Sequence, residues 1–301
     1  MQRDMVWLSG HVPYEQAQAI AERIGGWHVA VGTVWQQTQE HGQRLLEATE
    51  RAQQHVSLET TQWDNQRYAP QTRKAVSMDG GMVHVRDEGW KELKVGLVAD
   101  VPLINFARDE HVHLSNMGYC GVLGDVTAFE GALWALAVEQ DIPYAGTVVV
   151  TADGAAWIWR LADNYFPCAV QVVDWYHACQ HLAEAAQVRF PNDPLAAQHW
   201  TDDLKAHLFK GETYLICDQF IRYGLAAHAA YFQGHARRMQ YAQFQAAGFP
   251  IGSGGVESGV KQFKQRLSGP GMRWSRPGAE RMIVLRSAVL GDSFDRLWAA
   301  A

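Results

Sequence analysis

The sequence predicts an α/β protein in which a mixed β-sheet is combined with helical regions. Three observations predict this class. The spacing of apolar residues changes from a helical period to a two-residue period at Ala75, Thr147–Ala152 is a nearly continuous β-branched run, and residues 179–247 show only helical spacing. With 48% hydrophobic and 19% charged residues among 301, the chain can bury a sizeable core, which excludes a disordered or collagen-like protein.

The composition predicts a cytoplasmic protein. The longest stretch without a charged residue, Met239–Val256, contains Gln, Ser, Gly and Pro, so we expect no membrane span. The N-terminus lacks the apolar segment of a secretory signal. The four cysteines show no C-x-x-C pairing and are expected to be free thiols: Cys120, Cys168, Cys179 and Cys217.

Residues 1–51 are predicted to form a helical N-terminal region. Tyr14–Ile24 is amphipathic, Gly25-Gly26 interrupts the pattern, and Ala30–Glu50 resumes it. A small residue in the first helix, a glycine turn and apolar positions in the second are what a helix-turn-helix requires. An ordinary helical hairpin fits the same pattern equally well.

A polar linker at residues 52–74 is followed by residues 75–178, where the pattern predicts a sheet. Turns at Gly80-Gly81 and at 87–89 separate three expected strands: Ala75–Asp79, Met82–Arg86 and Trp90–Val98. A stretch without a clear pattern comes next, and then an amphipathic helix over 127–140.

Two apolar runs with a helix between them predict a βαβ unit. Thr147–Ala152 and Ala169–Val173 are the expected strands, and such a crossover makes them parallel. Three meandering strands, a helix, a strand, a helix and a strand is the element order of an RNase H-like fold. We expect residues 179–249 to be an all-helical insertion and residues 250–301 to complete the RNase H-like core.

Two aspartates are candidate metal ligands. Asp79 and Asp153 each precede a glycine at a predicted strand end, and the first and fourth strands of such a sheet can be neighbours. Two carboxylates held close together repel each other, and a divalent cation with a preference for oxygen ligands, Mg²⁺ or Mn²⁺, removes that penalty. Taken singly, each Asp-Gly pair is more typical of ordinary turn chemistry.

Glu257 is the third candidate carboxylate. It follows a glycine-rich loop, and Lys261 and Lys264 lie four and seven residues further along the same predicted helix, on one polar stripe. A carboxylate near the helix start could bind metal while the lysines contact a phosphate backbone. The alternative is a solvated Glu–Lys pair that stabilises the helix by only about 0.2–0.5 kcal/mol.

The net charge of −6 does not exclude a nucleic-acid partner, because basic residues are concentrated locally. Between Gly255 and Arg286, seven bases stand against two acids, a local charge of +5 that leaves −11 for the remainder. Phosphate binding depends on the field within about one Debye length, ~8–10 Å. Trp175 and Trp274 are candidates for stacking on a base. The candidate DNA-contact residues are Lys261, Lys264, Arg266, Arg273, Trp274 and Arg276.

Asp174 and His177 follow the second strand of the βαβ unit. Three residues apart at a helix start, they face the same way, and a helix cap with a paired histidine is the plain interpretation. Four other histidines lack zinc-ligand spacing and are interpreted as ordinary polar residues: His113, His181, His199 and His207.

Short motifs occur along the chain in the order found in a known family. They are S-M-D-G at 77–80, G-W-K-E-L-K-V-G at 89–96, T-A-D-G-A-A-W-I at 151–158, V-D-W-Y-H-A at 173–178, I-G-S-G-G-V-E-S at 251–258, R-L at 266–267 and G-M-R-W-S at 271–275. With these motifs and the segment 14–39, the chain resembles bacterial insertion-sequence transposases of the ISKra family, a DDE group related to the Mutator-like enzymes.

The resemblance implies a catalytic triad and two Mg²⁺ or Mn²⁺ ions. Asp79, Asp153 and Glu257 would hold the ions, one activating the nucleophile and one stabilising the leaving oxygen. The resemblance also implies that Asp174 and His177 fill the family's accessory D-x-x-H motif. Family members commonly have a longer, cysteine-containing region before the helix-turn-helix, which here is preceded by about a dozen residues. This departure from the family bears on end recognition.

The expected function is therefore metal-dependent cleavage and transfer of DNA strands by a transposase. Its partners would be double-stranded DNA, as element ends and target, and a second copy of the chain, because joining two ends requires two active sites. One alternative is a decayed or domesticated transposase that binds DNA without catalysis. A glycosidase with paired carboxylates is a further alternative, which would need neither a metal nor a basic helix.

Overall fold

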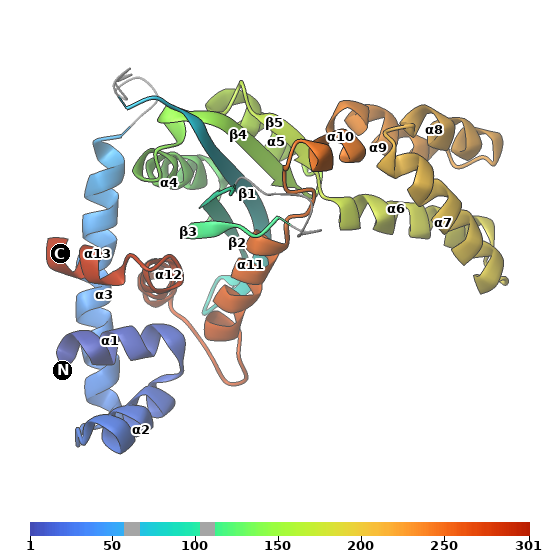
Figure 1. The fold of residues 1–301 in the computed structure, drawn as a ribbon. Coiled ribbons are helices and arrows are strands. Elements are labelled where there is room, and N and C mark those ends of the chain that lie inside the picture. The colour runs from blue at the N-terminus through green and yellow to red at the C-terminus, as the bar shows by residue number, and fades with distance from the viewer. Residues whose placement is uncertain (57–66, 103–111) are drawn as a thin grey trace.

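A five-stranded mixed sheet forms the centre of the protein (Figure 1). The computed structural model describes residues 1–56, 67–102 and 112–301. The strand order is β3-β2-β1-β4-β5, with β2 antiparallel to both neighbours and β1, β4 and β5 mutually parallel. The strands are β1 (Ala69–Val85), β2 (Gly89–Asp100), β3 (Ser115–Leu123), β4 (Ala145–Ala152) and β5 (Val170–Val173). The predicted mixed α/β class and the parallel βαβ unit are confirmed.

The predicted turn at Gly80-Gly81 is wrong, because β1 runs through both glycines. They pair with Lys94 and Leu93 of β2, so the first two expected strands are one. Gly81 serves close packing instead: a Cβ built there would lie only 3.0 Å from Val260 of the helix above it. The reversal occurs after Val85, where residues 87 and 89 adopt positive φ.

The third strand of the antiparallel part, β3, lies in the stretch for which no pattern was recognised. It is an edge strand, and Gly118 and Gly121 break its apolar alternation. Both glycines are sterically required. A Cβ added to Gly118 would lie 2.9 Å from Leu136 on one face of the sheet, and a Cβ added to Gly121 would lie 2.8 Å from Ile283 on the other. The ends of the predicted linker are regular structure, because α3 continues to Gln54 and β1 begins at Ala69; residues 57–66 lie outside the described part.

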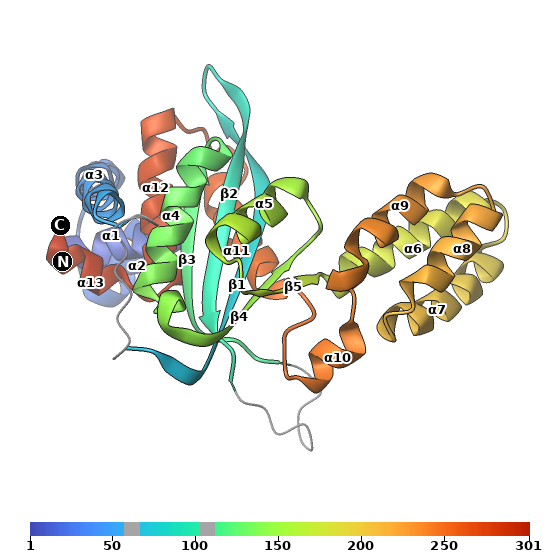
Figure 2. The same ribbon diagram turned by 90° about the horizontal axis from the view of Figure 1, so that it is seen from above.

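Helices cover both faces of the sheet (Figures 1 and 2). On one face, Val76 and Met78 of β1 pack with α4 (Val126–Glu139) and α5 (Ala156–Tyr165). On the other face, Val83 packs with helices α11 and α12. Side chains alternate along a strand, so Asp79 shares the face of Val83 and points to the side of α11. The helices of this second face are α11 (Gly254–Leu267), α12 (Arg276–Leu290) and α13 (Phe294–Ala300).

The N-terminal helices are docked on the core. They are α1 (Gln2–His11), α2 (Tyr14–Gly25) and α3 (Val31–Gln54), and the long α3 lies beside α12 (Figures 1 and 2). Gly26 ends α2 in the left-handed conformation, with φ 66°. Arg266 and Arg286 from the core donate hydrogen bonds to the carbonyls of Ser9 and Gly10 at the end of α1.

Residues 175–247 form a helical region that projects beyond β5 (Figure 2). Its interior is aromatic, with Trp200, Phe220 and Phe232 buried against one another. The helices here are α6 (Trp175–Arg189), α7 (Pro194–Phe209), α8 (Thr213–Arg222), α9 (Ala226–His235) and α10 (Tyr241–Ala246).

None of the helices in the described residues is both long enough and apolar enough to span a bilayer. The four cysteines are unpaired. The described residues also include two short 3₁₀ segments, η1 (Ile142–Tyr144) and η2 (Ala236–Arg238).

Candidate active site

The sheet places Asp79 and Asp153 side by side. Ser77 of β1 is the parallel partner of Thr151 of β4, and each aspartate lies two residues further along its own strand direction. Adjacent strands are about 4.8 Å apart, so the two carboxylates come from neighbouring positions. Asp153 directly follows β4, as predicted, whereas Asp79 lies inside β1 opposite Val95 and not at a strand end. The corrected position of Asp79 follows from the continuity of β1.

The packing of α11 brings Glu257 to the same face. Gly255 allows the helix to approach β2 closely, since a Cβ there would lie 2.7 Å from Leu97. Burial raises the pKa of Asp79, and the negative charges of Asp153 and Glu257 raise it further. The backbone N–H of Gly80, 2.6 Å from Asp79 Oδ1, and the nearby His177 lower it. The three carboxylates identified in the sequence, which we call the carboxylate cluster, therefore lie on one face of the sheet, near enough for their charges to interact.

Asp174 is buried and connects α6 to α11. It is 0% exposed; its Oδ1 caps α6 by accepting a hydrogen bond from the backbone N–H of His177 at 2.8 Å. The other oxygen, Oδ2, accepts from the backbone N–H and the hydroxyl of Ser253. The predicted cap is thus confirmed, but it uses the backbone of His177, and the imidazole instead lies near Asp79 and lowers the pKa of that carboxyl.

Ser253 lies between two acidic groups. Its Oγ is 2.8 Å from Asp174 Oδ2 and 3.0 Å from Glu257 Oε1. A hydroxyl has a single proton and donates to one of these oxygens at a time. Ser253 therefore orients Glu257 while leaving part of the local negative charge uncompensated. Ser253 belongs to the motif at 251–258, but the sequence alone gives no indication of this role.

The helical region holds the loop after β4 through Tyr231. The Tyr231 hydroxyl donates to the Asp153 carbonyl at 3.2 Å, and its ring fills the space beside Gly154, whose φ of 112° excludes most side chains. Asp153 Oδ1 accepts from the N–H of Ala155 at 2.9 Å. Burial, with the charges of Asp153 and Asp174, raises the pKa of Tyr231, so this phenol stays a neutral donor. Seventy-eight positions separate Tyr231 from Asp153, and no local pattern indicated the contact.

Three of the candidate DNA-contact residues expose their charge. Lys261, Lys264 and Arg273 are exposed, the first two on α11. The stem of Lys264 lies over Gly81, with Cδ 3.4 Å from a Cβ built there, on the face that carries Asp79. We call these three side chains the outward bases.

Arg266 and Trp274 are structural. Arg266 is 2% exposed; its Nε donates to the Ser9 carbonyl at 2.7 Å, and its guanidinium lies over the rings of Tyr14 and Trp274. Trp274 is 7% exposed and donates to the Leu267 carbonyl at 2.8 Å. Neither side chain is available to DNA at the surface. The pattern failed here because the helix face of Arg266 is covered by segments far away in the sequence.

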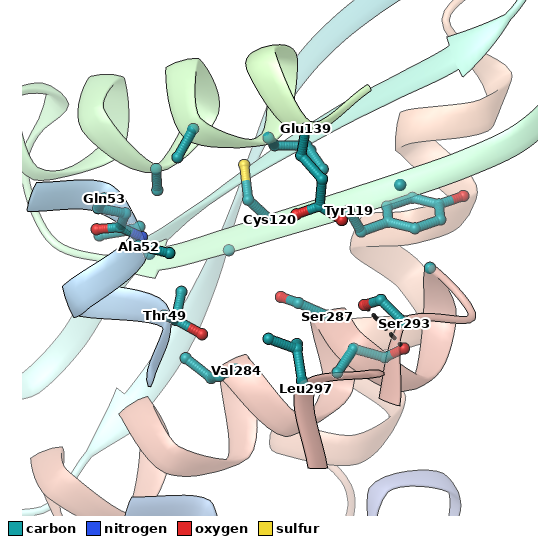
Figure 3. A pocket seen from close by; sticks show the side chains of 18 of the residues that line it. Thr49, Ala52, Gln53, Tyr119, Cys120, Glu139, Val284, Ser287, Ser293 and Leu297 are labelled. Atoms are coloured by element: carbon teal, nitrogen blue, oxygen red, sulfur yellow. Dashed lines mark hydrogen bonds between the residues drawn. The ribbon is translucent and has the colours of Figure 1, made fainter. Parts of the chain in front are cut away.

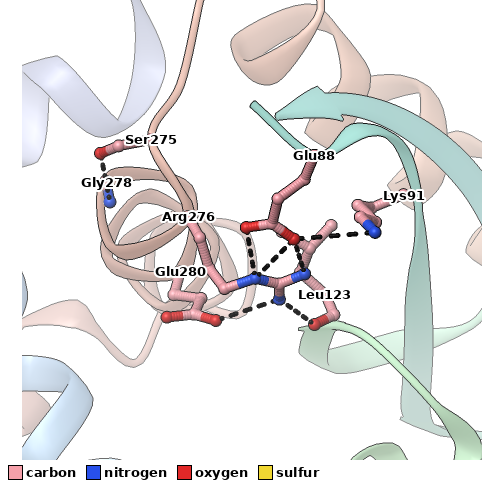
Figure 4. Close-up of polar contacts among 7 residues, drawn as sticks. All are labelled: Glu88, Lys91, Leu123, Ser275, Arg276, Gly278 and Glu280. Atoms are coloured by element: carbon pink, nitrogen blue, oxygen red, sulfur yellow. Dashed lines mark hydrogen bonds and ion pairs between the residues drawn. The ribbon is translucent and has the colours of Figure 1, made fainter. Parts of the chain in front are cut away.

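Arg276 and Trp175 are also engaged internally. Arg276 contacts both carboxylate oxygens of Glu88 at 2.6–3.0 Å and Glu280 at 3.4 Å, and donates to the Leu123 carbonyl at 3.2 Å (Figure 4). The hydrogen bond to Glu88 raises its pKa. Trp175 packs edge-on against two aromatic rings of the helical region, those of Phe209 and Tyr241.

The donor chemistry of the carboxylate cluster fits a hard divalent cation. Carboxylate oxygens are the ligands that Mg²⁺ and Mn²⁺ prefer, and a cation would relieve the repulsion that raises the pKa of Asp79. Within residues 1–56, 67–102 and 112–301, no group of three His, Cys, Asp or Glu side chains stands in a metal-holding arrangement, so the carboxylates have the right chemistry and share one face but do not form a ready-made ligand set.

A cavity of about 580 Å³ lies apart from the carboxylates, between α3, β3, α4 and α12 (Figure 3). Thr49, Cys120, Glu139 and Ser287 are among its lining residues. None of the three carboxylates lines it, so the cavity belongs to the seam between the N-terminal helices and the core.

No protein-family model matches this sequence, and a search of curated proteins finds no similar sequence.

Proposed function

We propose that the chain is a DNA transposase that cleaves and transfers strands with divalent metal ions. The observation that carries this proposal is the convergence of Asp79, Asp153 and Glu257 from β1, the end of β4 and α11 on one face of the sheet. The strand order β3-β2-β1-β4-β5, with a helical region between β5 and α11, supports an RNase H-like core. The chemistry that the proposal implies is hydrolysis and transesterification of phosphodiesters.

The residues around the carboxylates would keep them in place during the reaction. Ser253 orients Glu257, the N–H of Ala155 fixes Asp153, and the N–H of Gly80 holds Asp79. Asp79, Asp153 and Glu257 would hold two Mg²⁺ or Mn²⁺ ions, whose chemistry is to activate the attacking oxygen and neutralise the leaving oxygen. His177 favours the charged form of Asp79.

The outward bases would contact DNA phosphates next to the reacting strand. Such contacts position the duplex and carry no sequence information, so sequence preference would belong to the α2–turn–α3 segment as a helix-turn-helix. Action on two element ends requires two active sites, which supports a homodimer on DNA. The setting would be the bacterial cytoplasm, where the chain meets the nucleoid.

Cleavage of a labelled duplex by the purified full chain with Mn²⁺ tests the proposal. We expect cleavage that EDTA abolishes, and a loss of at least 100-fold in rate for Asp79→Asn, Asp153→Asn and Glu257→Gln. DNA affinity measured without metal should stay near that of the wild type. Asp218→Asn is the matched control, because Asp218 is a carboxylate exposed on α8 outside the site, and this variant should still cleave.

Three outcomes would contradict the proposal in different ways. If Glu257→Gln cuts DNA at the wild-type rate, Glu257 is not part of the catalytic site. A wild-type chain that binds DNA but never cuts with Mg²⁺ or Mn²⁺ supports a decayed or domesticated copy. Sugar hydrolysis without metal would support the glycosidase alternative.

A further inference from the structure

Tyr176 is an exposed aromatic side chain at the rim of the carboxylate cluster. It is the second residue of α6 and is 68% exposed. Asp174 and His177, which flank it, both belong to the site. Its ring carbon Cε2 lies 3.5 Å from a Cβ built on Gly252, the residue before Ser253. The ring therefore stands against the loop that orients Glu257.

The surroundings of Tyr176 differ from those of Trp175 and Trp274, the two tryptophans that the sequence indicates as candidates for base stacking. Trp274 is buried, and Trp175 packs within the helical region. The described part of the chain shows no ring contact and no hydrogen bond from the side chain of Tyr176, and its ring is largely in water. A flat ring with a polar tip, next to a cluster that would handle phosphates, suits a partner with a π-face.

We propose that Tyr176 stacks on a nucleobase next to the reacting phosphate. This inference rests on the proposed function and adds a contact to the DNA itself. In the sequence, Tyr176 directly precedes His177, which lowers the pKa of Asp79. It follows Asp174 by two residues, and Asp174 accepts a hydrogen bond from Ser253 in the loop before Glu257. A strand whose phosphate reaches the carboxylates would bring an adjacent base to this rim. Stacking tolerates any base, so it adds affinity for unpaired DNA without sequence preference.

Two changes test the stacking contact independently: a substitution removes the ring of Tyr176, and an abasic strand removes the bases of the DNA. We would measure binding of the full chain to a fluorescently labelled dT 20-mer and to a 20-mer of abasic sugar-phosphate with the same charge, by anisotropy without divalent ions. A homopolymer makes the binding register irrelevant. Tyr176→Ala should weaken dT binding about 5- to 100-fold and leave abasic binding unchanged, whereas Tyr176→Phe should match the wild type. Tyr176→Leu, which keeps an apolar side chain without the ring, should behave as Tyr176→Ala.

Tyr214 supplies a matched control. It is also 68% exposed, but on α8 of the helical region, and Tyr214→Ala should change neither affinity. Equal losses on both strands, or no loss on either, would overturn the role of Tyr176. If the wild type cleaves duplex DNA with Mn²⁺ while Tyr176→Ala binds dT normally, only the stacking inference fails. If the wild type neither binds these strands nor cleaves DNA, the proposed function fails as well.

Discussion

The basic segment between Gly255 and Arg286 divides into two sets of side chains with opposite uses. The outward bases place their charge in solvent beside α11. The remaining four, which we call the inward bases, bind groups of the protein: Arg266 the Ser9 carbonyl, Arg276 Glu88 and Glu280, Arg281 Gln39 and Gln43, and Arg286 the Gly10 carbonyl. The local charge of +5 therefore overstates what a DNA backbone would meet.

Side-chain chemistry explains why all four inward bases are arginines and why both lysines are outward, although one arginine, Arg273, is also exposed. A guanidinium has five N–H donors in a planar fork, which suits backbone carbonyls and stacked rings, whereas an ammonium is a strongly hydrated point charge. Ser9 and Gly10 lie at the C-terminal end of α1, where the helix dipole favours a cation. Burial lowers the pKa of Arg266 and Arg286, but both remain charged at neutral pH because their ordinary value is so high. Arg266, Arg281 and Arg286 thus join the N-terminal helices to the core, whereas Arg276 holds groups within the core.

Removing an inward base should produce the largest effect of this comparison. Arg266→Ala leaves the Ser9 carbonyl without its donor and removes the guanidinium between Tyr14 and Trp274. We expect the free energy of unfolding to fall by about 2–4 kcal/mol, measured by urea denaturation. Lys264→Ala, two residues away and exposed, should change it by less than about 0.5 kcal/mol. Equal stability of the two variants would show that Arg266 does not hold the seam.

Removing two outward bases should change DNA binding and leave stability intact. Lys261→Ala combined with Lys264→Ala should lower the slope of log affinity against log salt by about two, because each lysine releases about one counterion. Affinity should fall alike for all duplex sequences. The measurement is anisotropy of a labelled duplex from 50 to 200 mM salt. A change in sequence preference at constant slope would show that these lysines read bases.

The inward bases also determine how the N-terminal helices can be tested. Deleting residues 1–50 would leave Arg266 and Arg286 without their carbonyl partners, so loss of binding would not separate recognition from folding. Point changes on exposed positions of α3 avoid this problem. Gln36 lies near the start of α3, and Gln54 lies at its end; both are exposed.

Gln36 and Gln54 of α3 therefore allow a test of sequence recognition that leaves the fold intact. The preferred duplex would first be selected by the wild-type chain from a randomised library. Gln36→Ala should then lower the preference for that duplex over a scrambled one by about tenfold, the size of one lost base contact. Gln54→Ala should not change the preference. If both variants keep it, α3 does not enter the major groove at this position.

The parts of the fold that sequence predicted are those decided by local pattern. The β-branched run of β4 and the apolar stripe of α11 need no knowledge of distant residues, and both are found where expected. The continuity of β1 depends on α11 packing against Gly81, and an isolated glycine pair resembles a turn. The carboxylates were predicted because each lies in a distinct motif. Tyr231 and the partners of Arg266 were not, because those contacts join segments far apart in the chain.

The last and smallest effect concerns the electrostatic repulsion among Asp79, Asp153 and Glu257. The pKa of Asp79 is raised above its ordinary value of 3.8 in the folded chain, mainly by burial and then by Asp153 and Glu257. Below the unfolded-state pKa both states are protonated and Asp79 has no effect on stability. As pH rises toward the folded-state pKa, the unfolded state loses its proton first, so stability falls, and above that pKa the loss is complete.

Asp79→Asn should therefore be more stable than the wild type at pH 7 without metal, and equal to it at pH 3. The difference should develop as pH rises from 3.8 toward the higher folded-state pKa. It should be small because Asp79 is only partly buried and water screens its neighbours. Urea denaturation at pH 3, 5 and 7 in EDTA measures it, with Asp218→Asn, exposed on α8, as the control. A variant less stable at pH 7 would show that Asp79 is stabilised by its neighbours, and the strained carboxylate cluster would have to be abandoned.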